Sequence, residues 1–407
     1  MTENWARSYN YQGTVVTPAT LDEVQELVGS TENVRALGTR HSFTGIADTT
    51  GTLLSLAGLP QEPRVDGSVV HVPGGMRYGE LATWLQARGL ALHNLASLPH
   101  ISIAGAVATG THGSGDRNGT LAAAVASIDL VTASGELVTL RRGDPDFAGA
   151  VVSLGALGVV TSLALDVQPT FDVRQDLYDG LPWSDLLDNL DAVTGAAYSV
   201  SVFTNWQGDT IDLLWVKSRM DAAEPPATLL GATRQAVERH MLPDQATVST
   251  TQQGGIPGPW NDRLAHFKLE FTPSNGEELQ SEYLVPRANA VEALRGLREL
   301  RDSISPLLLI TELRTMAADE LWLSGAYETD AVGIHFTWKK LPVEVAAVLP
   351  SIEAVLLPLG ARPHWGKVFT RLEPANYPRL DDFLELRSRF DPAGKFDNAF
   401  LQKHLGG

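Results

Sequence analysis

The sequence predicts an α+β fold with two domains, and three observations support this prediction. The chain has 407 residues, more than a single hydrophobic core usually organises. Its first third alternates between helical and strand patterns, whereas the residues after about 170 read mostly as long alternating strands with helices between them. The end of the chain returns to a helix and a turn, so we expect it to fold back on the first domain. The expected boundaries are residues 1–170, completed by 368–407, for the first domain and 171–367 for the second.

In the first domain, helix and strand signals follow one another at short intervals. Thr20 and Glu23 form a capping box for a helix that Gly29 ends. A second helix is predicted over residues 78–88. Strand patterns occupy residues 34–37, 53–56, 68–72, 122–132 and 137–140.

In the second domain, long strands dominate. They are predicted at residues 199–204, 211–217, 267–272, 307–315 and 332–339, with helices at 291–302 and 344–357. A further helix at 380–390 belongs to the C-terminal segment that completes the first domain. Side chains two apart in a strand share a face, so Glu312 and Arg314 point the same way. The same rule groups His335, Thr337 and Lys339. Such a polar face can be solvated or can bind a ligand, and periodicity alone favours solvent.

Composition excludes several classes of function. The formal net charge is −17 and Lys and Arg form no run, which argues against nucleic acid and anionic membranes as partners. No apolar run reaches the length of a membrane span, and the N-terminus lacks the features of a secretory signal. The chain has no cysteine, which rules out disulfides, thiolate metal sites and thiol catalysis. The ten histidines are scattered, so no metal is expected. We expect a cytoplasmic protein.

The most unusual segment is a run of small residues from Ser102 to Gly115. Glycines let another group touch the backbone, and hydroxyls with free N–H groups suit phosphate oxygens. A dinucleotide would need such a surface, although a tightly packed buried turn explains the run equally well. Neither a P-loop nor a dinucleotide-binding glycine motif between strand and helix is present.

Five motifs resemble one known family. They are RALGTRHSF at residues 35–43, ASLPHISIAG at 96–105 and on to Ser114, TELRT at 311–315, HWGK at 364–367 and DPAGKFDN at 391–398. Together they resemble the vanillyl-alcohol-oxidase-type flavoproteins and, within them, the alditol and xylitol oxidases. The resemblance covers the whole chain. It implies an FAD-binding domain of two α+β subdomains and a substrate domain built on an antiparallel sheet.

The resemblance also implies that His41 carries FAD as a covalent tether through the flavin 8α-methyl group. Neutral imidazole is a competent nucleophile for that bond, and the protein supplies positioning and electronic tuning. Many relatives have glycine just before this histidine, whereas this chain has Arg40, which would be strained if the position requires φ > 0. The expected cofactor-binding residues besides His41 are Ala36, Leu37, Gly38, Thr39, Arg40, Ser42, Ser102, Gly105, Thr109, Gly110, Thr111, His112, Val160 and His364.

For the substrate, the resemblance implies a small polyol whose terminal primary alcohol is oxidised to the aldose. The matching substrate-binding residues are Ser97, Gln280, Glu312, Arg314, His335, Thr337 and Lys367. Each buried hydroxyl without a partner costs about 1–3 kcal/mol, so a polyol pocket needs many donors and acceptors.

For the mechanism, we expect hydride transfer from C1 to flavin N5, with O₂ reduced to H₂O₂. Lys367 is the expected proton acceptor because the pKa of lysine is tuned more readily than that of arginine. Arg314 would stabilise the developing alkoxide, and Glu312 would hold Arg314 or bind a hydroxyl. The alternatives are an aldonolactone oxidase or dehydrogenase of the same family and a non-catalytic flavin- or sugar-binding protein. We expect a monomer.

Overall fold

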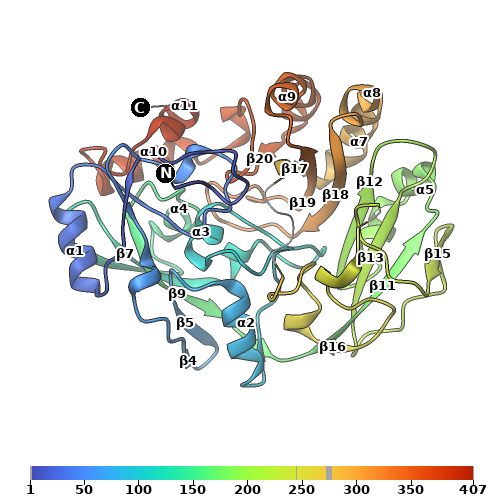
Figure 1. Cartoon of the computed structure of the whole chain (residues 1–407), viewed down its shortest axis with the longest axis horizontal. Coiled ribbons are helices and arrows are strands. Elements are labelled where there is room, and N and C mark those ends of the chain that lie inside the picture. The colour runs from blue at the N-terminus through green and yellow to red at the C-terminus, as the bar shows by residue number, and fades with distance from the viewer. Residues whose placement is uncertain (1, 244, 272–276, 407) are drawn as a thin grey trace.

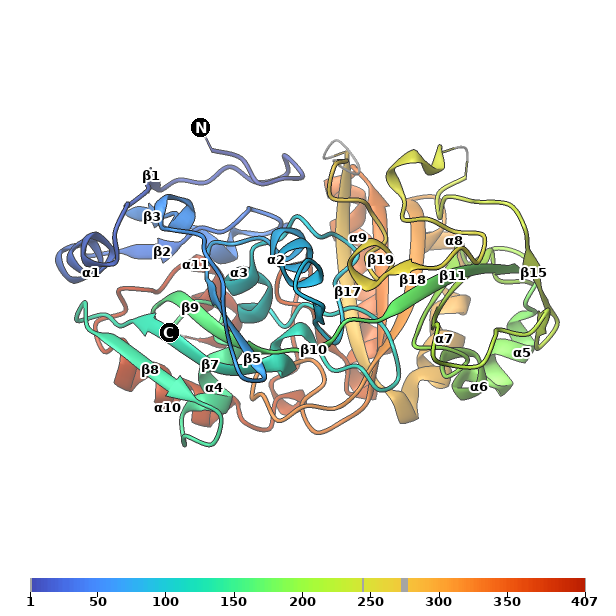
Figure 2. The ribbon, with the colours of Figure 1, turned by 90° about the horizontal axis from the view of Figure 1, so that it is seen from below.

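The computed structural model describes residues 2–243, 245–271 and 277–406. A ten-stranded antiparallel sheet forms one side of the molecule, and two smaller sheets with their helices form the other (Figures 1 and 2). The smaller sheets come from residues before 167 and the large sheet from residues 172–363. The expected α+β architecture, with a large antiparallel sheet in the second part of the chain, is confirmed.

A parallel three-stranded sheet contains the start of the motif at residues 35–43. Its order is β1 (Thr14–Val16), β3 (Thr52–Leu54) and β2 (Val34–Ala36). The first helix, α1 (Leu21–Ser30), packs Val24 and Val28 against this sheet. The Thr20 side chain accepts a hydrogen bond from the Glu23 N–H, which confirms the predicted helix start, and the helix ends one residue beyond Gly29.

An antiparallel five-stranded sheet lies beside it, in the order β4 (Arg64–Asp66), β5 (Val69–Pro73), β9 (Val159–Asp166), β7 (Val125–Val131), β8 (Leu137–Arg141). A two-stranded sheet joins β6 (Leu90–Ala91) to β10 (Gln168–Pro169). The helices of this region are α2 (Tyr78–Gln86), α3 (Ile103–Ala108) and α4 (Phe147–Val151). Helix α3 begins inside the small-residue run and contacts β9.

The large sheet brings distant segments into register. Its order is β14 (Thr228–Leu229), β15 (Ala232–Gln235), β11 (Asp172–Asp179), β13 (Leu213–Arg219), β12 (Ser199–Thr204), β18 (Leu308–Met316), β19 (Ala331–Lys339), β17 (Glu278–Pro286), β20 (Arg362–Pro363), and β16 (Gly258–Pro259) also pairs with β11. Across it, Glu312 pairs with His335, and His335 pairs with Glu282. The register therefore places three titratable side chains in one row.

Helices cover the opposite face of this sheet. They are α5 (Trp183–Asp188), α6 (Leu190–Thr194), α7 (Ala290–Glu299), α8 (Arg301–Ile304) and α9 (Pro342–Leu356), with α7 and α9 packed on β17 (Figure 1). On the covered face, the rings of Phe336 and Trp338 stack with centroids 5.0 Å apart. Their alternation with His335 and Thr337 confirms the predicted two-faced strand.

Helix α9 belongs to a long apolar segment that the sequence analysis did not identify. The segment Pro342–Leu359 is long and apolar enough by composition to cross a membrane. In the structure, Val345, Leu349 and Ile352 are buried within the main core, and the helix contacts β17 and α7. Glu353 on the same helix accepts a hydrogen bond from the Tyr283 hydroxyl at 2.9 Å. Its packing is that of a core helix.

The C-terminal helices α10 (Leu380–Phe390) and α11 (Ala399–Leu405) lie against the N-terminal part of the chain (Figure 1). The segment before α11 also bonds there: Val34 N–H donates to the Lys395 carbonyl at 3.1 Å, and Arg35 Nη1 donates to the Phe396 carbonyl at 2.7 Å. The Asn398 side-chain amide lies within 3.2 Å of the carbonyls of Gly45, Ile46 and Asp48. The tail therefore helps to fix the segment that follows β2.

One strand prediction was wrong. Residues 267–271 do not form a strand: Phe267 makes a single bridge to Thr250, and Phe271 N–H donates to the Lys268 carbonyl in a turn. Thr272 lies outside the described residues. Conversely, β17 was not predicted, although it lies inside the large sheet. Short 3₁₀ helices connect several elements: Gly45–Ala47, Leu56–Gly58, Leu121–Ala124, Thr247–Ser249, Trp260–Asp262, Arg287–Asn289, Leu357–Leu359 and Pro374–Asn376.

Candidate active site

A cavity of about 820 Å³ lies between the N-terminal part of the chain and the large sheet. Its size is in the upper part of the about 300–1,000 Å³ range of ligand pockets. Every residue predicted for the cofactor or the substrate lines it, except Gly110. Gly110 has φ +65° and turns the chain between Thr109 and Thr111, which both reach the wall. The cavity thus brings together segments that are far apart in the sequence, from Trp5 to Lys367.

One end of the cavity is lined by small residues and bare backbone. A Cβ added to Gly105 would come 2.9 Å from Ser102 Oγ, and one added to Gly38 would collide with the same hydroxyl. The backbone N–H groups of residues 38–42 donate to no acceptor within the described parts of the chain. A run of free amides in an irregular loop is a site for anionic oxygens. This end suits a phosphate-bearing ligand.

His41 lies in that loop, and its ring is held on two sides. Its Nδ1 lies 3.0 Å from Thr39 Oγ1, which itself accepts a hydrogen bond from Ser102 N–H at 2.9 Å. The Trp5 ring stacks on the imidazole with centroids 5.4 Å apart and an interplanar angle of 26°. Loss of hydration lowers the pKa of His41 to about 4, and the charges of His100 and Arg40 act in the same direction. The imidazole is therefore neutral at pH 7.

Arg40 adopts a backbone conformation that favours glycine. Its φ is +64°, in the left-handed region, which costs a residue with a Cβ about 1–2 kcal/mol. The N-terminal segment holds it there: Trp5 N–H donates to the Arg40 carbonyl at 2.8 Å, and Arg40 Nη1 donates to the Glu3 carbonyl at 3.2 Å. The anticipated strain before His41 is present in the structure.

The other end of the cavity carries buried charged groups centred on Glu282 of β17. Its Oε1 lies 3.0 Å from Arg314 Nη2 and 3.0 Å from His112 Nε2, and its Oε2 lies 3.0 Å from Lys367 Nζ. Burial alone would raise the pKa of Glu282, but Lys367 and Arg314 hold that pKa well below its usual range. Glu282 is therefore an anion that links the two cations proposed for catalysis.

The pKa values of Arg314 and Lys367 shift in opposite directions. Burial lowers the pKa of each, but for Arg314 the charges of Glu312 and Glu282 reverse the shift and raise it. For Lys367 the net shift is downward, because burial and the charge of Arg314 outweigh Glu282. Arg314 is thus a permanent cation, whereas Lys367 is the group that can lose a proton.

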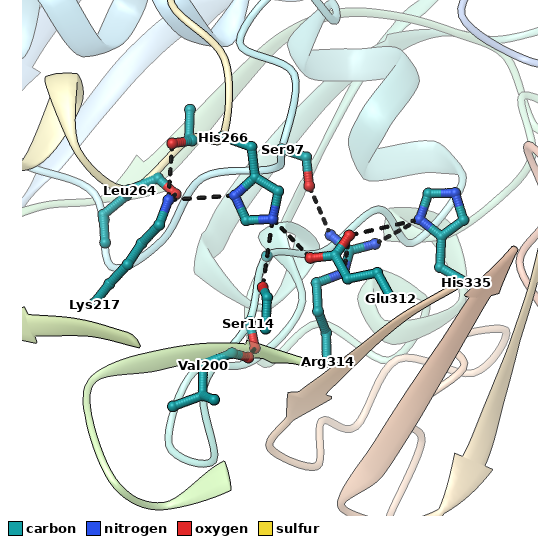
Figure 3. A network of polar contacts seen from close by, with 12 residues as sticks. Ser97, Ser114, Val200, Lys217, Leu264, His266, Glu312, Arg314 and His335 are labelled. Carbon is teal, nitrogen blue, oxygen red and sulfur yellow. Dashed lines mark hydrogen bonds and ion pairs between the residues drawn. The ribbon is translucent and has the colours of Figure 1, made fainter. Parts of the chain in front are cut away.

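The remaining predicted substrate residues surround this cluster. Ser97 Oγ accepts from Arg314 Nη1 at 3.2 Å (Figure 3). His335 lies between the cations, with Nδ1 3.4 Å from Arg314 Nη2 and Nε2 3.2 Å from Lys367 Nζ, and burial with the charge of Lys367 lowers its pKa well below the usual range. On neighbouring strands, Gln280 pairs with Thr337.

Three residues at or behind the polar end escaped the sequence analysis. Glu282 follows Gln280 by two positions, so recognition of strand β17 would have placed both on one face. His266 lies in a loop, with Nε2 2.7 Å from Glu312 Oε1, and Lys217 lies 3.3 Å from its Nδ1 (Figure 3). A single histidine in a loop carries no periodic signal. Lys217 lies on strand β13 and is unusual only because it is buried, which the sequence does not reveal.

Comparisons with known proteins identify the family of this chain. A family described as FAD binding domain matches residues 13–141, and one described as D-arabinono-1,4-lactone oxidase matches residues 272–404. An alditol oxidase from a Streptomyces species is 48% identical over 413 residues, covering 99% of each chain. The chain belongs to the alditol oxidase family. It is an FAD-dependent oxidoreductase of the vanillyl-alcohol-oxidase type, as the sequence motifs predicted.

This alditol oxidase homologue is also similar to two further proteins. L-gulono-1,4-lactone dehydrogenase from Mycobacterium tuberculosis is 31% identical over 96% of each chain. The crystal structure of a cholesterol oxidase from B. sterolicum matches with a TM-score of 0.80 over 99% of this chain and 96% of that one, at 17% identity. This structural likeness confirms the shared fold.

The observed cavity fits FAD. The free amides of residues 38–42 provide donors for a pyrophosphate, and the glycine-lined wall leaves room against the backbone. Within the described residues, no group of three or more His, Asp and Glu side chains is arranged to hold a metal ion.

Proposed function

We propose that the protein oxidises the terminal primary alcohol of an alditol, such as xylitol or sorbitol, to the aldose, with O₂ reduced to H₂O₂. The observation that carries this proposal is the buried polar end of the cavity, where Glu312, Arg314 and Lys367 converge beside a wall that fits FAD. The 48% identity to a protein named alditol oxidase supports the substrate class.

FAD would be held by the loop of residues 38–42 and the small-residue wall, and we propose that His41 is its covalent attachment point. The lowered pKa of His41 supports this, because only a neutral imidazole has a free lone pair for bond formation. Trp5 and Thr39 fix the orientation of the ring. When bound, FAD supplies the hydride acceptor and the route for electrons to O₂.

The polar end supplies what a polyol needs. A polyol presents a hydroxyl on every carbon, and each buried hydroxyl left unpaired costs about 1–3 kcal/mol. Glu312 and Gln280 can accept hydrogen bonds from hydroxyls, and Arg314 can donate to them. An apolar pocket of the same size would bind such a molecule poorly.

The proton of the reacting hydroxyl goes to Lys367 in this proposal. Burial and the charge of Arg314 lower the pKa of Lys367, which makes its neutral amine easier to form than that of an exposed lysine, and this amine accepts the proton as the C–H hydride leaves. Arg314 remains cationic and stabilises the negative charge that develops on the oxygen. The product is then a neutral aldehyde, and the proton remains on Lys367.

A lactone oxidase or dehydrogenase is the second candidate. The match of residues 272–404 to a family described as D-arabinono-1,4-lactone oxidase favours it, as does the 31% identity to L-gulono-1,4-lactone dehydrogenase. The two candidates differ in substrate, and a lactone dehydrogenase would also differ from an alditol oxidase in electron acceptor.

A substrate panel tests the proposal. The purified flavoprotein is assayed with xylitol, sorbitol, glycerol and L-gulono-1,4-lactone, once with O₂ and peroxide detection and once with an artificial electron acceptor. We expect kcat/KM to be highest for a polyol with stoichiometric H₂O₂. Turnover of the lactone alone would refute the alditol assignment, and turnover only with the artificial acceptor would refute the oxidase assignment. Flavin that separates from acid-precipitated protein would refute the covalent tether.

A further inference from the structure

Glu312 is backed by two buried residues that the mechanism above does not use. Its Oε1 lies 2.7 Å from His266 Nε2, and His266 Nδ1 lies 3.3 Å from Lys217 Nζ (Figure 3). Lys217, on β13, is 1% exposed and stands behind the cavity wall, whereas His266 and Glu312 are part of that wall. The row runs from the interior of the large sheet to the proposed substrate site.

The surroundings of Lys217 match an ammonium group. Its Nζ lies 2.7 Å from the Leu264 carbonyl, 2.8 Å from the Ala265 carbonyl and 3.3 Å from His266 Nδ1. An ammonium group has three donors and no acceptor, and three acceptors surround it here. Lys217 therefore donates to Nδ1, and the proton of the neutral His266 ring must lie on Nε2.

Two aromatic side chains restrict the rotation of the His266 ring. Its ring meets Trp215 edge to face with centroids 5.0 Å apart, and Phe203 lies 6.0 Å away. Burial lowers the pKa of His266 to about 4, although Glu312 opposes the shift, so the ring is neutral at pH 7. Its Nε2–H then points at Glu312 Oε1, while Glu312 Oε2 lies 3.5 Å from Arg314 Nε.

We propose that Lys217 and His266 are positioning residues for substrate binding: Lys217 fixes the tautomer of His266, and His266 Nε2–H holds Glu312 in the orientation that receives a substrate hydroxyl. The inference rests on the proposed function, since Glu312 must meet a polyol. Without the lysine, the imidazole proton could move to Nδ1, and a bare Nε2 would face the carboxylate and repel it.

The alternative is that Lys217 only caps two carbonyls in a buried loop. That role would affect stability but not the tautomer of His266, so the tautomer is the deciding measurement. Other titratable groups near the row are Arg263, Arg314 and His335. They are left unchanged in every variant.

The first experiment is nitrogen NMR on the flavin-loaded protein with ¹⁵N-labelled histidine, using His266→Gln to assign the His266 signals. Burial lowers the pKa of Lys217 to about 7, so spectra are recorded at about pH 6, where the ammonium form dominates. We expect a protonated Nε2 in the wild type and a signal shifted towards protonated Nδ1 in Lys217→Met. Lys339→Met, which removes an exposed lysine, should leave the signal unchanged. An unchanged tautomer in Lys217→Met overturns the proposal.

The second experiment measures kinetics with the best polyol of the substrate panel. Glutamine keeps a donor near the position of Nε2, whereas leucine removes it, so His266→Leu should raise KM about 10- to 100-fold more than His266→Gln. The effect should fall mainly on KM, and Lys217→Met combined with His266→Leu should be no worse than His266→Leu alone. Equal KM values for the Gln and Leu variants overturn the proposal even if Lys217→Met does not fold. If the wild type oxidises no polyol, the proposed function fails, and the NMR result alone decides whether Lys217 controls His266.

Discussion

Lys367 Nζ lies 3.0 Å from Glu282 Oε2 in the wall of the cavity, where Glu282 is buried and Lys367 is partly buried. This pairing sets the proton affinity of the amine that we propose as the base. The carboxylate favours the ammonium form, while burial and Arg314 favour the neutral amine. The balance between them determines the pH at which Lys367 can accept a proton.

Replacement of Lys367 by Met should lower the rate of anaerobic flavin reduction by at least about 10²-fold, because general base catalysis contributes about 10²- to 10⁴-fold. The rate is measured by stopped-flow absorbance of the flavin at saturating polyol. Lys339→Met, on the exposed end of β19, is the matched control and should reduce at the wild-type rate. A Lys367→Met enzyme that is reduced as fast as the wild type would exclude this lysine as the base.

Replacement of Glu282 by Gln should move the acidic limb of kcat/KM to lower pH. Glu282 raises the pKa of Lys367, so removal of its charge lowers that pKa and lets the amine deprotonate at a lower pH. KM should rise as well, because Arg314 loses its ion pair with Glu282. The pH profile is compared with that of Glu344→Gln, an exposed carboxylate on α9. An acidic limb that moves to higher pH would contradict this account.

Replacement of Trp5 by Ala should reduce the fraction of protein that carries covalent flavin. The Trp5 ring stacks on His41, so the imidazole loses this support when the ring is removed, whereas the backbone N–H of residue 5 still donates to the Arg40 carbonyl. His41→Ala should lose covalent flavin entirely, and Trp84→Ala, outside the cavity wall, should retain it. The readout is flavin fluorescence of denatured protein on a gel. Full flavin attachment in Trp5→Ala would show that the stacking has no role in attachment.

Replacement of Arg40 by Gly should leave the free energy of unfolding unchanged or raise it by up to about 1.5 kcal/mol. Relief of the left-handed strain gains about 1–2 kcal/mol, and the flexibility of glycine in the unfolded chain costs about 0.5–1 kcal/mol. Arg64→Gly, at a strand position without positive φ, should be destabilised. Urea denaturation checks both variants. A clear loss of stability in Arg40→Gly would mean that the bond to Glu3 outweighs the strain.

Much of the fold was predictable because local rules decided it. The cap at Thr20 fixed the start of α1, and strand alternation placed Glu312 with Arg314 and His335 with Thr337. The strand predicted at 267–272 failed because the chain turns after Phe267, a choice made by contacts with distant residues. The family motifs located most of the cavity wall, which no single periodicity could have done.

What sequence reasoning could not supply was the pairing of charges across the large sheet. Glu282 and Arg314 are 32 positions apart, and only the β17–β19–β18 register brings them together. Lys217 and His266 are 49 positions apart, and no pattern in the sequence marks their contact. Long-range pairings of this kind are properties of the folded sheet and leave little trace in neighbouring residues.

The hydrogen bonds between β2 and the C-terminal segment impose an order on maturation. The carbonyls of Lys395 and Phe396 accept from Val34 and Arg35, and Asn398 bonds to the segment that follows His41. A ribosome makes residues 395–398 only after more than 350 intervening residues. The wall around His41 is therefore incomplete until this segment has emerged, and we expect FAD to be captured after that point and not by the N-terminal part alone.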